Sequence, residues 1–370
     1  MAVDLAKPNL IVAVFGAGTM GRGIAQVCAQ AGVTTLLFDS RDGAVKEAIA
    51  AVDKGLEGLV AKQRMTPAAK KDVLEHLKPI NSLDEAKGAG IVIEAIVENL
   101  AAKRALFREL EKRVSAVCVL ATNTSSLSVT EMAAGLAHPE RVVGFHLFNT
   151  VAVLPLVEVV RGSATGDAAV ATALAVGKTL GKSCVIVADQ PAFVVNRLLT
   201  RFLGEIIRAV DEGTPFEIAE HAADSLGLPM TPFLLLQLVG PAVALHVGET
   251  LNAAFPDRFT VSPKLRELVA SGKTAVYLPD FTVGPEVAAI LAGGDHPSNG
   301  PETASRALEG LAQEIRIMLD EGVVAAPEDI DLCMILGAGW PFHLGGITPY
   351  LDRTGIAAKV TGAPFRGEHT

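Results

Sequence analysis

The first half of the chain alternates short apolar runs with longer segments of helical periodicity. Ile11–Phe15 is apolar, rich in β-branched residues and followed by a glycine, which predicts a buried parallel strand. Met20–Ala31 then has the pattern of a helix and Thr35–Phe38 that of a second strand, so the three segments form a βαβ unit. Further strands are predicted at Gly90–Ala95, Val117–Ala121, Val142–His146, Val157–Val160 and Cys184–Val187. This alternation, which continues to about residue 188, predicts an α/β domain with a doubly wound sheet.

A charged helical stretch separates the second strand from the third. It covers Ala44–Leu77 and breaks at Met65–Pro67, where Thr66 is suited to cap a new helix and Pro67 to begin it. We therefore expect two consecutive helices in this excursion.

After residue 190 the strand patterns nearly stop and helical periodicity takes over. Glu205–Gly213 reads EIIRAVDEG and Glu314–Gly322 reads EIRIMLDEG, an offset of 109 residues, and a Gly-x-Pro turn follows each copy. Asp280–Pro301, with four glycines and three prolines, is the predicted linker between the copies. The sequence thus predicts an all-α domain made of two related helical repeats. We expect a nucleotide-binding domain at residues 1–190, a first helical domain at 191–296 and a second repeat at 297–370.

Composition indicates a well-packed acidic protein. Of 370 residues 50% are hydrophobic, and 32 basic side chains face 41 acidic ones, which gives a net charge of −9. Because nucleic acid attracts basic surfaces, we expect no nucleic-acid partner, and any anionic ligand must be bound locally. The four cysteines are far apart in apolar runs, so we expect free thiols in a reducing compartment and no metal site.

One long uncharged segment requires a membrane test. Ser225–Gly248 lacks a formal charge, but it contains three prolines, Gln237 and His246, which a lipid-exposed span tolerates badly. We interpret it as buried core or a subunit interface rather than an integral membrane segment. The N-terminus, MAVDLAKPNL, lacks the pattern of a leader, and the expected location is cytoplasmic.

The glycine motif after the first strand carries the clearest chemistry. Gly16-Ala17-Gly18-Thr19-Met20-Gly21 follows a strand and opens a helix, as in dinucleotide-binding Rossmann domains. Gly16 would form the turn, Gly18 would let the backbone approach a pyrophosphate, and Gly21 would let the helix pack closely. Asp39, at the end of the next strand, would bind the adenine ribose and favour NAD over NADP, although Arg41 two residues later softens that preference.

A histidine and a carboxylate suggest acid–base chemistry. His146 closes one predicted strand and Glu158 lies in the next, twelve residues later. A histidine whose far nitrogen meets a carboxylate can take a proton from a hydroxyl while hydride leaves its carbon. By spacing alone, however, a lone histidine is usually structural.

Six motifs occur in the order found in L-3-hydroxyacyl-CoA dehydrogenases, and the chain resembles that family over almost its whole length. The motifs are GAGTMG, VENLAAK (Val97–Lys103), TNTSSL (Thr122–Leu127), GFHLFN, LVEVV and FVVNRLL (Phe193–Leu199). The C-terminal run Ile335–Gly355 is similar to the second helical repeat of multifunctional fatty-acid oxidation enzymes. The chain resembles their dehydrogenase module without the hydratase/isomerase half, either as a standalone protein or as a fragment. It departs from the family at Thr150, where a proline is usual, and at Gly272–Gly284.

The resemblance implies roles for individual residues. His146 would be the general acid/base, oriented by Glu158, while Ser125 and Asn196 would bind the substrate near its reacting carbon. The implied cofactor-contacting positions are Met20, Glu98, Lys103 and Asn149. Without the resemblance, the sequence favours a turn or a helix cap for Ser125 and a helix start for Asn196, while Glu98 and Lys103 are equally suited to a solvated ion pair.

A basic cluster in the helical excursion is a candidate clamp for the phosphates of coenzyme A. It comprises Lys54, Lys62, Arg64, Lys70 and Lys71, of which Lys62 and Arg64 are the predicted substrate contacts. Interleaved acidic residues make a solvated helix face the alternative.

The resemblance implies NAD-dependent, reversible oxidation of L-(3S)-3-hydroxyacyl-CoA to 3-ketoacyl-CoA in fatty-acid β-oxidation. The alternatives are an NAD dehydrogenase of a free hydroxy or sugar acid, and a non-catalytic subunit of a β-oxidation complex. Acyl-CoA is the expected substrate, and a hydratase and a thiolase are possible partners. Monomer and homodimer both stay open, as do the acyl chain length and the physiological direction.

Overall fold

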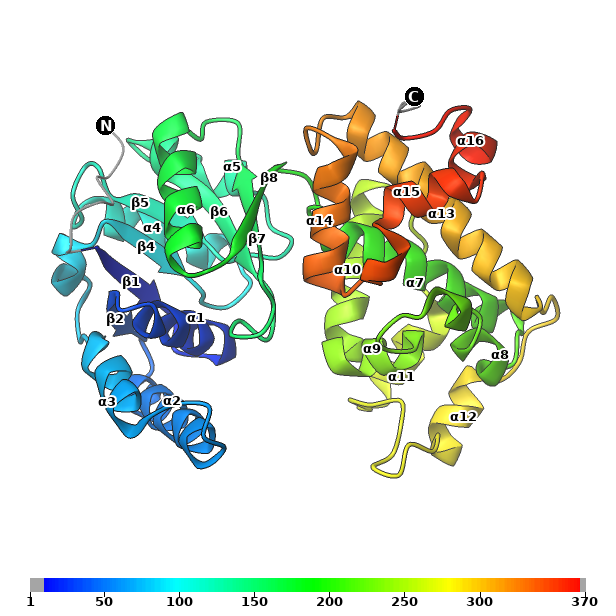
Figure 1. The fold of residues 1–370 in the computed structure, drawn as a ribbon, viewed down its shortest axis with the longest axis horizontal. Helices are drawn as coiled ribbons and strands as arrows, with labels where there is room; N and C mark the ends of the chain where they lie inside the picture. Colours follow the sequence, from blue (N-terminus) through cyan, green and yellow to red (C-terminus); the bar gives the residue numbers. More distant parts are fainter. Residues whose placement is uncertain (1–9, 367–370) are drawn as a thin grey trace. The chain divides into compact units, whose positions relative to one another are not determined.

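The structure, a computed structural model, describes residues 10–366. The chain divides into two compact units, Met1–Asp189 and Gln190–Thr370 (Figure 1). Residues 1–9, which make up most of the N-terminal stretch where no leader is expected, lie outside the described residues.

The first unit contains one eight-stranded sheet with strand order β3-β2-β1-β4-β5-β6-β7-β8. Its strands are β1 Ile11–Phe15, β2 Thr34–Phe38, β3 Leu77–Pro79, β4 Ile91–Glu94, β5 Val119–Thr122, β6 Val142–Leu147, β7 Leu156–Arg161 and β8 Ser183–Ala188. The order reverses direction at β1, from which the chain builds outward on both sides, as in Rossmann-type sheets. The doubly wound α/β sheet predicted from the sequence is confirmed.

Two features of the sheet differ from the sequence-based expectation. Strand β3 begins at Leu77, the last residue of the stretch predicted to be helical, and pairs with β2 through only three residues. Strand β7 runs antiparallel to β6, whereas every other pair of neighbouring strands is parallel. The connection Phe148–Pro155 is too short for the crossover of about a dozen residues that a parallel pair needs. The antiparallel pairing sets the register of the site described below.

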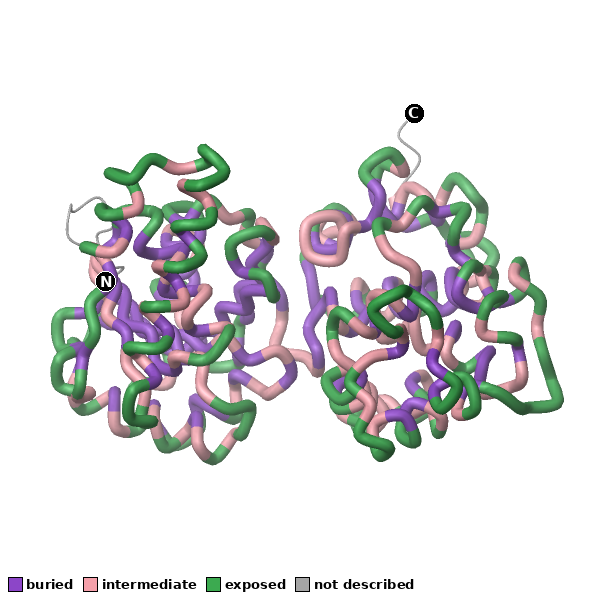
Figure 2. Tube along the Cα trace, turned by 90° about the horizontal axis from the view of Figure 1, so that it is seen from below, coloured by how far each residue is buried: buried purple, intermediate pink, exposed green. Residues whose placement is uncertain are grey.

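Both faces of strands β1, β4, β5, β6 and β7 are buried, which explains why these strands are almost continuously apolar. On one face, Val12, Val14 and Ile93 share a core with α1 (Thr19–Gln30) and α6 (Asp167–Thr179), both in front of the sheet in Figure 1. The other helices are α2 Ala44–Ala61, α3 Pro67–His76, α4 Leu100–Glu111 and α5 Val129–Ala133. Figure 2 shows the buried residues of this unit gathered in its interior and the exposed residues around its outside.

The break predicted inside the charged helical stretch is confirmed. Helix α2 ends at Ala61 and α3 begins at Pro67. The Thr66 hydroxyl accepts a hydrogen bond from the Ala69 amide at 3.1 Å, and Pro67 occupies the first turn, where no amide proton is needed.

The second unit is helical. Its helices are α7 Val195–Glu212, α8 Phe216–Glu220, α9 Pro232–Val239, α10 Pro241–Ala254, α11 Pro263–Ala270, α12 Pro285–Leu291, α13 Gly300–Asp320, α14 Pro327–Ala338, α15 Ile347–Arg353 and α16 Ile356–Thr361. The two copies of the repeated motif form the ends of α7 and α13, which pack together more extensively than any other pair of helices. The glycines that close the motifs, Gly213 and Gly322, both adopt positive φ, at 114° and 66°.

Two segments of this unit are more ordered, or more exposed, than the sequence suggested. The predicted linker Asp280–Pro301 contains helix α12. The uncharged segment forms α9 and α10, of which Phe233 is buried but Leu238 is 66% exposed, so a buried core describes only one face. No single helix within residues 10–366 is long and apolar enough to cross a membrane. Taken together, α9 and α10 have the length and composition of a span, but the two helices are bent by 96° at their junction.

Candidate active site

The glycine motif forms the turn between β1 and α1. Gly16 has φ +106°, and a Cβ atom there would lie 2.4 Å from the Ala95 carbonyl oxygen. A Cβ on Gly21 would lie 1.8 Å from the carbonyl oxygen of Gly16, whereas one on Gly18 would meet open space. Gly16 and Gly21 are therefore required by packing, while Gly18 leaves the backbone open to a ligand at the start of α1.

Asp39 lies at the carboxyl end of β2 and faces this turn. Its Oδ2 accepts from the Ala17 amide at 2.7 Å, and its Oδ1 accepts from the Arg41 amide at 2.8 Å. The Arg41 guanidinium pairs with Glu47 at 2.6 Å on the surface. The carboxylate is thus fixed beside the glycine turn, while the competing arginine is held by another acid.

The antiparallel β6–β7 pair brings the predicted acid–base residues together. His146 lies directly opposite Glu158 in the strand register, and its Nδ1 lies 2.7 Å from Glu158 Oε2. Both side chains are buried, at 5% and 0% exposure. A carboxylate at Nδ1 places the proton on that nitrogen and makes Nε2 the basic atom of the ring. The Phe148 ring, 4.3 Å away between centroids, packs against the imidazole.

A second polar cluster links the ends of β4 and β5. Glu98 accepts hydrogen bonds at Oε1 from the Thr124 hydroxyl at 2.5 Å and the Ser125 amide at 3.0 Å. The Lys103 ammonium lies 3.2 Å from Glu98 Oε2. Burial alone would raise the pKa of Glu98, but the Lys103 charge and these hydrogen bonds outweigh it and hold that pKa below its ordinary value. Glu98 is therefore fixed in its ionised form next to Ser125.

Glu94 is a residue of this cluster that the sequence analysis missed. Its side chain is fully buried, accepts from Lys103 at 2.7 Å and from the Thr122 hydroxyl at 2.7 Å. Lys103 itself is only 1% exposed, and its ammonium pairs with Glu94 and Glu98 instead of being open to a ligand. An acidic residue at the carboxyl end of an otherwise apolar strand was the signal available in the sequence.

The remaining predicted residues occupy separate places. Ser125 is half-buried in the loop after β5, Met20 is half-buried in the first turn of α1, and Asn149 is exposed after β6. Asn196 is half-buried in the first turn of α7, in the second unit.

The basic cluster divides into paired and surface residues. Lys70 pairs with Asp53 at 2.8 Å and with Glu57, and Lys71 lies 3.7 Å from Glu75. Lys62 and Arg64 are exposed at the turn between α2 and α3. Lys54 is also exposed, on α2, so the exposed cations that a phosphate clamp could use include Lys54, Lys62 and Arg64.

Comparison with known proteins agrees with this geometry. A family model described as 3-hydroxyacyl-CoA dehydrogenase, NAD binding domain, matches residues 11–190, and the corresponding C-terminal domain model matches residues 193–276. The fatty acid oxidation complex subunit alpha of Acinetobacter baylyi is 32% identical over 376 residues, covering 96% of this chain and 52% of that relative. The chain thus spans about half the length of the curated relatives it matches.

Solved structures show the same similarity over both units. The 3-hydroxybutyryl-CoA dehydrogenase of Escherichia coli K12 matches with a TM-score of 0.81 and 26% identity, covering 97% of each chain. (S)-3-hydroxybutyryl-CoA dehydrogenase PaaH1 from Ralstonia eutropha matches with a TM-score of 0.69 and 34% identity, covering 77% of this chain and 99% of that chain. The matched NAD binding domain contains the glycine turn, Asp39 and the His146–Glu158 pair. The chain therefore belongs to the 3-hydroxyacyl-CoA dehydrogenase family, as the resemblance of its motifs indicated.

Proposed function

We propose that the chain catalyses the reversible, NAD-dependent oxidation of an L-3-hydroxyacyl-CoA to the 3-ketoacyl-CoA, as a step of fatty-acid β-oxidation. The buried His146–Glu158 pair, joined at 2.7 Å within an NAD-binding domain, is the observation that carries this proposal. A buried carboxylate is strongly destabilising unless it is paired, and the contact with His146 supplies the partner that Glu158 needs in β7.

The residues of the chain divide the reaction between them. Bound NAD would supply the acceptor for the hydride of substrate C3. His146 Nε2 takes the proton of the C3 hydroxyl, and Glu158 stabilises the imidazolium that results. In the reverse direction the imidazolium returns the proton to the 3-keto oxygen. The base and its orienting carboxylate lie on adjacent strands, so they need no rearrangement to act.

The first unit supplies the features that NAD requires. We assign the turn at Gly18 and the start of α1 to the pyrophosphate and Asp39 to the adenine ribose; the open space at Gly18 and the contact of Asp39 with this turn support the assignment. We assign Met20, Glu98 and Asn149 to the rest of the dinucleotide, with the Lys103 ammonium, itself paired with Glu94, holding Glu98 ionised.

Polar residues of the chain are also assigned to the substrate. Ser125 is bound to Glu98 through its amide, and Asn196 lies in the first turn of α7; we assign both to the substrate near its reacting carbon or thioester. Lys62 and Arg64 are assigned to the phosphates of coenzyme A.

The setting of the reaction is also proposed. The four cysteines are free thiols, and burial raises the pKa of Cys28 to about 12 and that of Cys184 to about 11, so these thiols stay protonated. We place the protein in a reducing cytoplasm, where a hydratase and a thiolase act on its substrate and product.

Oxidation of NADH by 3-ketoacyl substrates tests the function. Acetoacetyl-CoA, a longer 3-ketoacyl-CoA and free acetoacetate are each offered to the protein with NADH. Turnover of the CoA esters but not of acetoacetate is the expected result. Equal turnover of free acetoacetate would replace this function by a dehydrogenase of free hydroxy acids. No turnover, together with co-purification of a hydratase or thiolase, would indicate a non-catalytic subunit.

A further inference from the structure

A buried arginine ties the start of α7 to α13. The Nε of Arg197 donates to Glu314 Oε1 at 2.6 Å, and its Nη2 donates to Glu321 Oε2 at 3.1 Å. Arg197 and Glu314 are both 0% exposed. The Phe255 ring lies 4.6 Å from the guanidinium carbon, and Arg258 also binds Glu314, at 3.2 Å. Because a buried charge without its partner is strongly destabilising, this contact holds Arg197 in one position.

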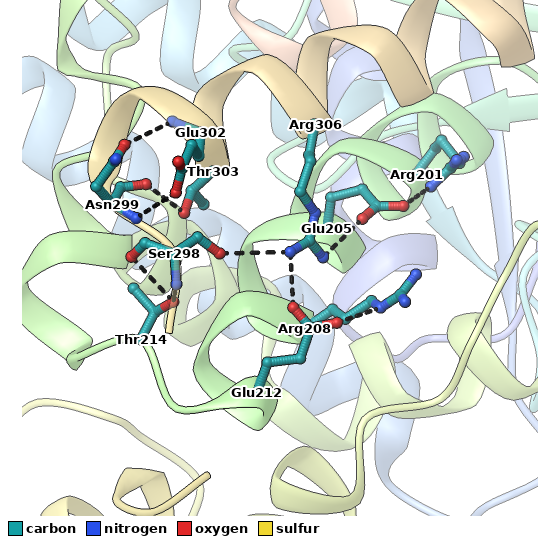
Figure 3. Close-up of polar contacts among 10 residues, drawn as sticks. All are labelled: Arg201, Glu205, Arg208, Glu212, Thr214, Ser298, Asn299, Glu302, Thr303 and Arg306. Atoms are coloured by element: carbon teal, nitrogen blue, oxygen red, sulfur yellow. Dashed lines mark hydrogen bonds and ion pairs between the residues drawn. The ribbon is translucent and has the colours of Figure 1, made fainter. Parts of the chain in front are cut away.

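The same contact recurs with the two helices exchanged. Arg306 of α13 donates through Nη1 to Glu212 at 2.6 Å and through Nη2 to Glu205 at 3.3 Å (Figure 3). Arg306 lies 109 residues after Arg197, and each carboxylate of one set lies 109 residues from its counterpart in the other. The repeated motif therefore builds two equivalent ion-pair sets, one at each end of the α7–α13 contact. The second set is wetter, since the Arg306 side chain is 31% exposed.

The two copies differ in the residue that precedes the arginine. Asn196 stands before Arg197, whereas the equivalent residue in the second copy is Ser305, which is exposed and donates to Glu309 at 2.9 Å. Successive helical residues point about 100° apart around the axis, so an anchored Arg197 fixes the direction of Asn196 as well. Only the first copy thus couples its ion pair to a residue assigned to the substrate.

We propose that Glu314 is a positioning residue for the substrate: by holding Arg197, it fixes the first turn of α7 and the amide of Asn196. The second helical copy then acts as a scaffold for a substrate contact that only the first copy possesses. This inference rests on the proposed function through the assignment of Asn196. Glu314 touches neither substrate nor cofactor in this scheme.

The equivalent ion pair provides a matched control. Glu314→Gln and Glu205→Gln each remove one carboxylate charge from the α7–α13 contact. We expect Glu314→Gln to lower kcat/KM for acetoacetyl-CoA about tenfold or more, since small misplacement of a positioning group is costly, and to leave the Kd for NADH unchanged. Glu205→Gln should keep kcat/KM within about twofold, although both variants unfold at a lower temperature.

A readout that needs no turnover separates this inference from the proposed function. The side-chain amide resonance of Asn196, assigned through Asn196→Ala, should shift in Glu314→Gln and stay in place in Glu205→Gln. Absence of a differential shift, or an equal loss of kcat/KM in both variants, would overturn the positioning role. Absence of turnover by the unaltered protein would reject the proposed function, and the resonance would still decide the position of Asn196. If Glu314→Gln does not fold, Glu321→Gln compared with Glu212→Gln repeats the test at the more exposed partners.

Discussion

Glu158 is fully buried in a sheet whose two faces are both covered, where an isolated carboxylate would cost several kcal/mol. Its pairing with His146 across two antiparallel strands compensates part of that cost and holds the ring in one orientation. A different buried acid, Glu94, is compensated in another way, by Lys103 and a threonine hydroxyl. Glu158 thus orients an imidazole, whereas Glu94 fixes the Lys103 ammonium, which also pairs with Glu98.

The histidine at the centre of this arrangement gives the most direct prediction for a single residue. His146→Gln should lower kcat by roughly 10²–10⁴-fold, the usual contribution of general acid–base catalysis, while NADH still binds. Steady-state rates with acetoacetyl-CoA and a fluorescence titration with NADH measure the two quantities. His138 is the matched control, because it also faces a carboxylate, Glu140 at 3.1 Å, but on the surface. Undiminished turnover in His146→Gln, or an equal loss in His138→Gln, would remove His146 from its role.

Glu98 yields a prediction about pH. Its pKa in the folded protein lies below its ordinary value of 4.5, so its ionised form stabilises the fold at neutral pH. That contribution is fully present above pH 4.5 and is lost as the pH falls through the lowered folded-state value. Glu98→Gln should therefore unfold at lower urea concentration than the unaltered protein at pH 7, by a free energy of about 1 kcal/mol. The gap should narrow as the pH falls below 4.5, and a gap independent of pH would contradict the assignment.

At the scale of elements, hydrophobic pattern predicted the strands of the first unit well but not their direction. Runs such as Ile11–Phe15 are buried on both faces and leave a clear apolar signal. The antiparallel course of β7 follows from a short connection, and β3 is a three-residue edge strand without a pattern of its own. The sequence alone did not identify Glu94, because its partners Lys103 and Thr122 lie on other elements and come together only in the fold.

The basic residues near the turn between α2 and α3 have two proposed roles, binding of coenzyme A and pairing of the two helices, and two variants test them separately. Lys62→Ala/Arg64→Ala should raise KM for acetoacetyl-CoA about threefold to tenfold, because each exposed cation contributes up to about 1 kcal/mol, and should barely change KM for NADH. Lys70 instead ties α3 to Asp53 and Glu57 of α2, so Lys70→Ala should lower the unfolding temperature without changing either KM. Equal effects of the double variant on both KM values would show that this turn does not hold coenzyme A.

The whole molecule carries a net charge of −9, which opposes the approach of an anionic substrate. This repulsion acts over a long range, whereas the attraction by two exposed cations acts close to the surface. The screening length falls from about 30 Å at 0.01 M salt to about 10 Å at 0.1 M, so added salt removes the long-range repulsion first. The salt dependence of KM therefore reports which of the two governs substrate capture.

If the local cations govern, KM of the unaltered protein for acetoacetyl-CoA should rise as salt increases, because screening weakens the short-range attraction as well. In Lys62→Ala/Arg64→Ala only the repulsion remains, so its KM should fall over the same range. Lys87→Ala/Lys178→Ala lowers the net charge equally at two exposed lysines outside the α2–α3 turn and should keep the rising slope of the unaltered protein. Initial rates at 0.01 and 0.1 M salt distinguish the three proteins. If KM falls with salt in all three proteins, net charge alone governs substrate capture, and Lys62 and Arg64 do not attract coenzyme A.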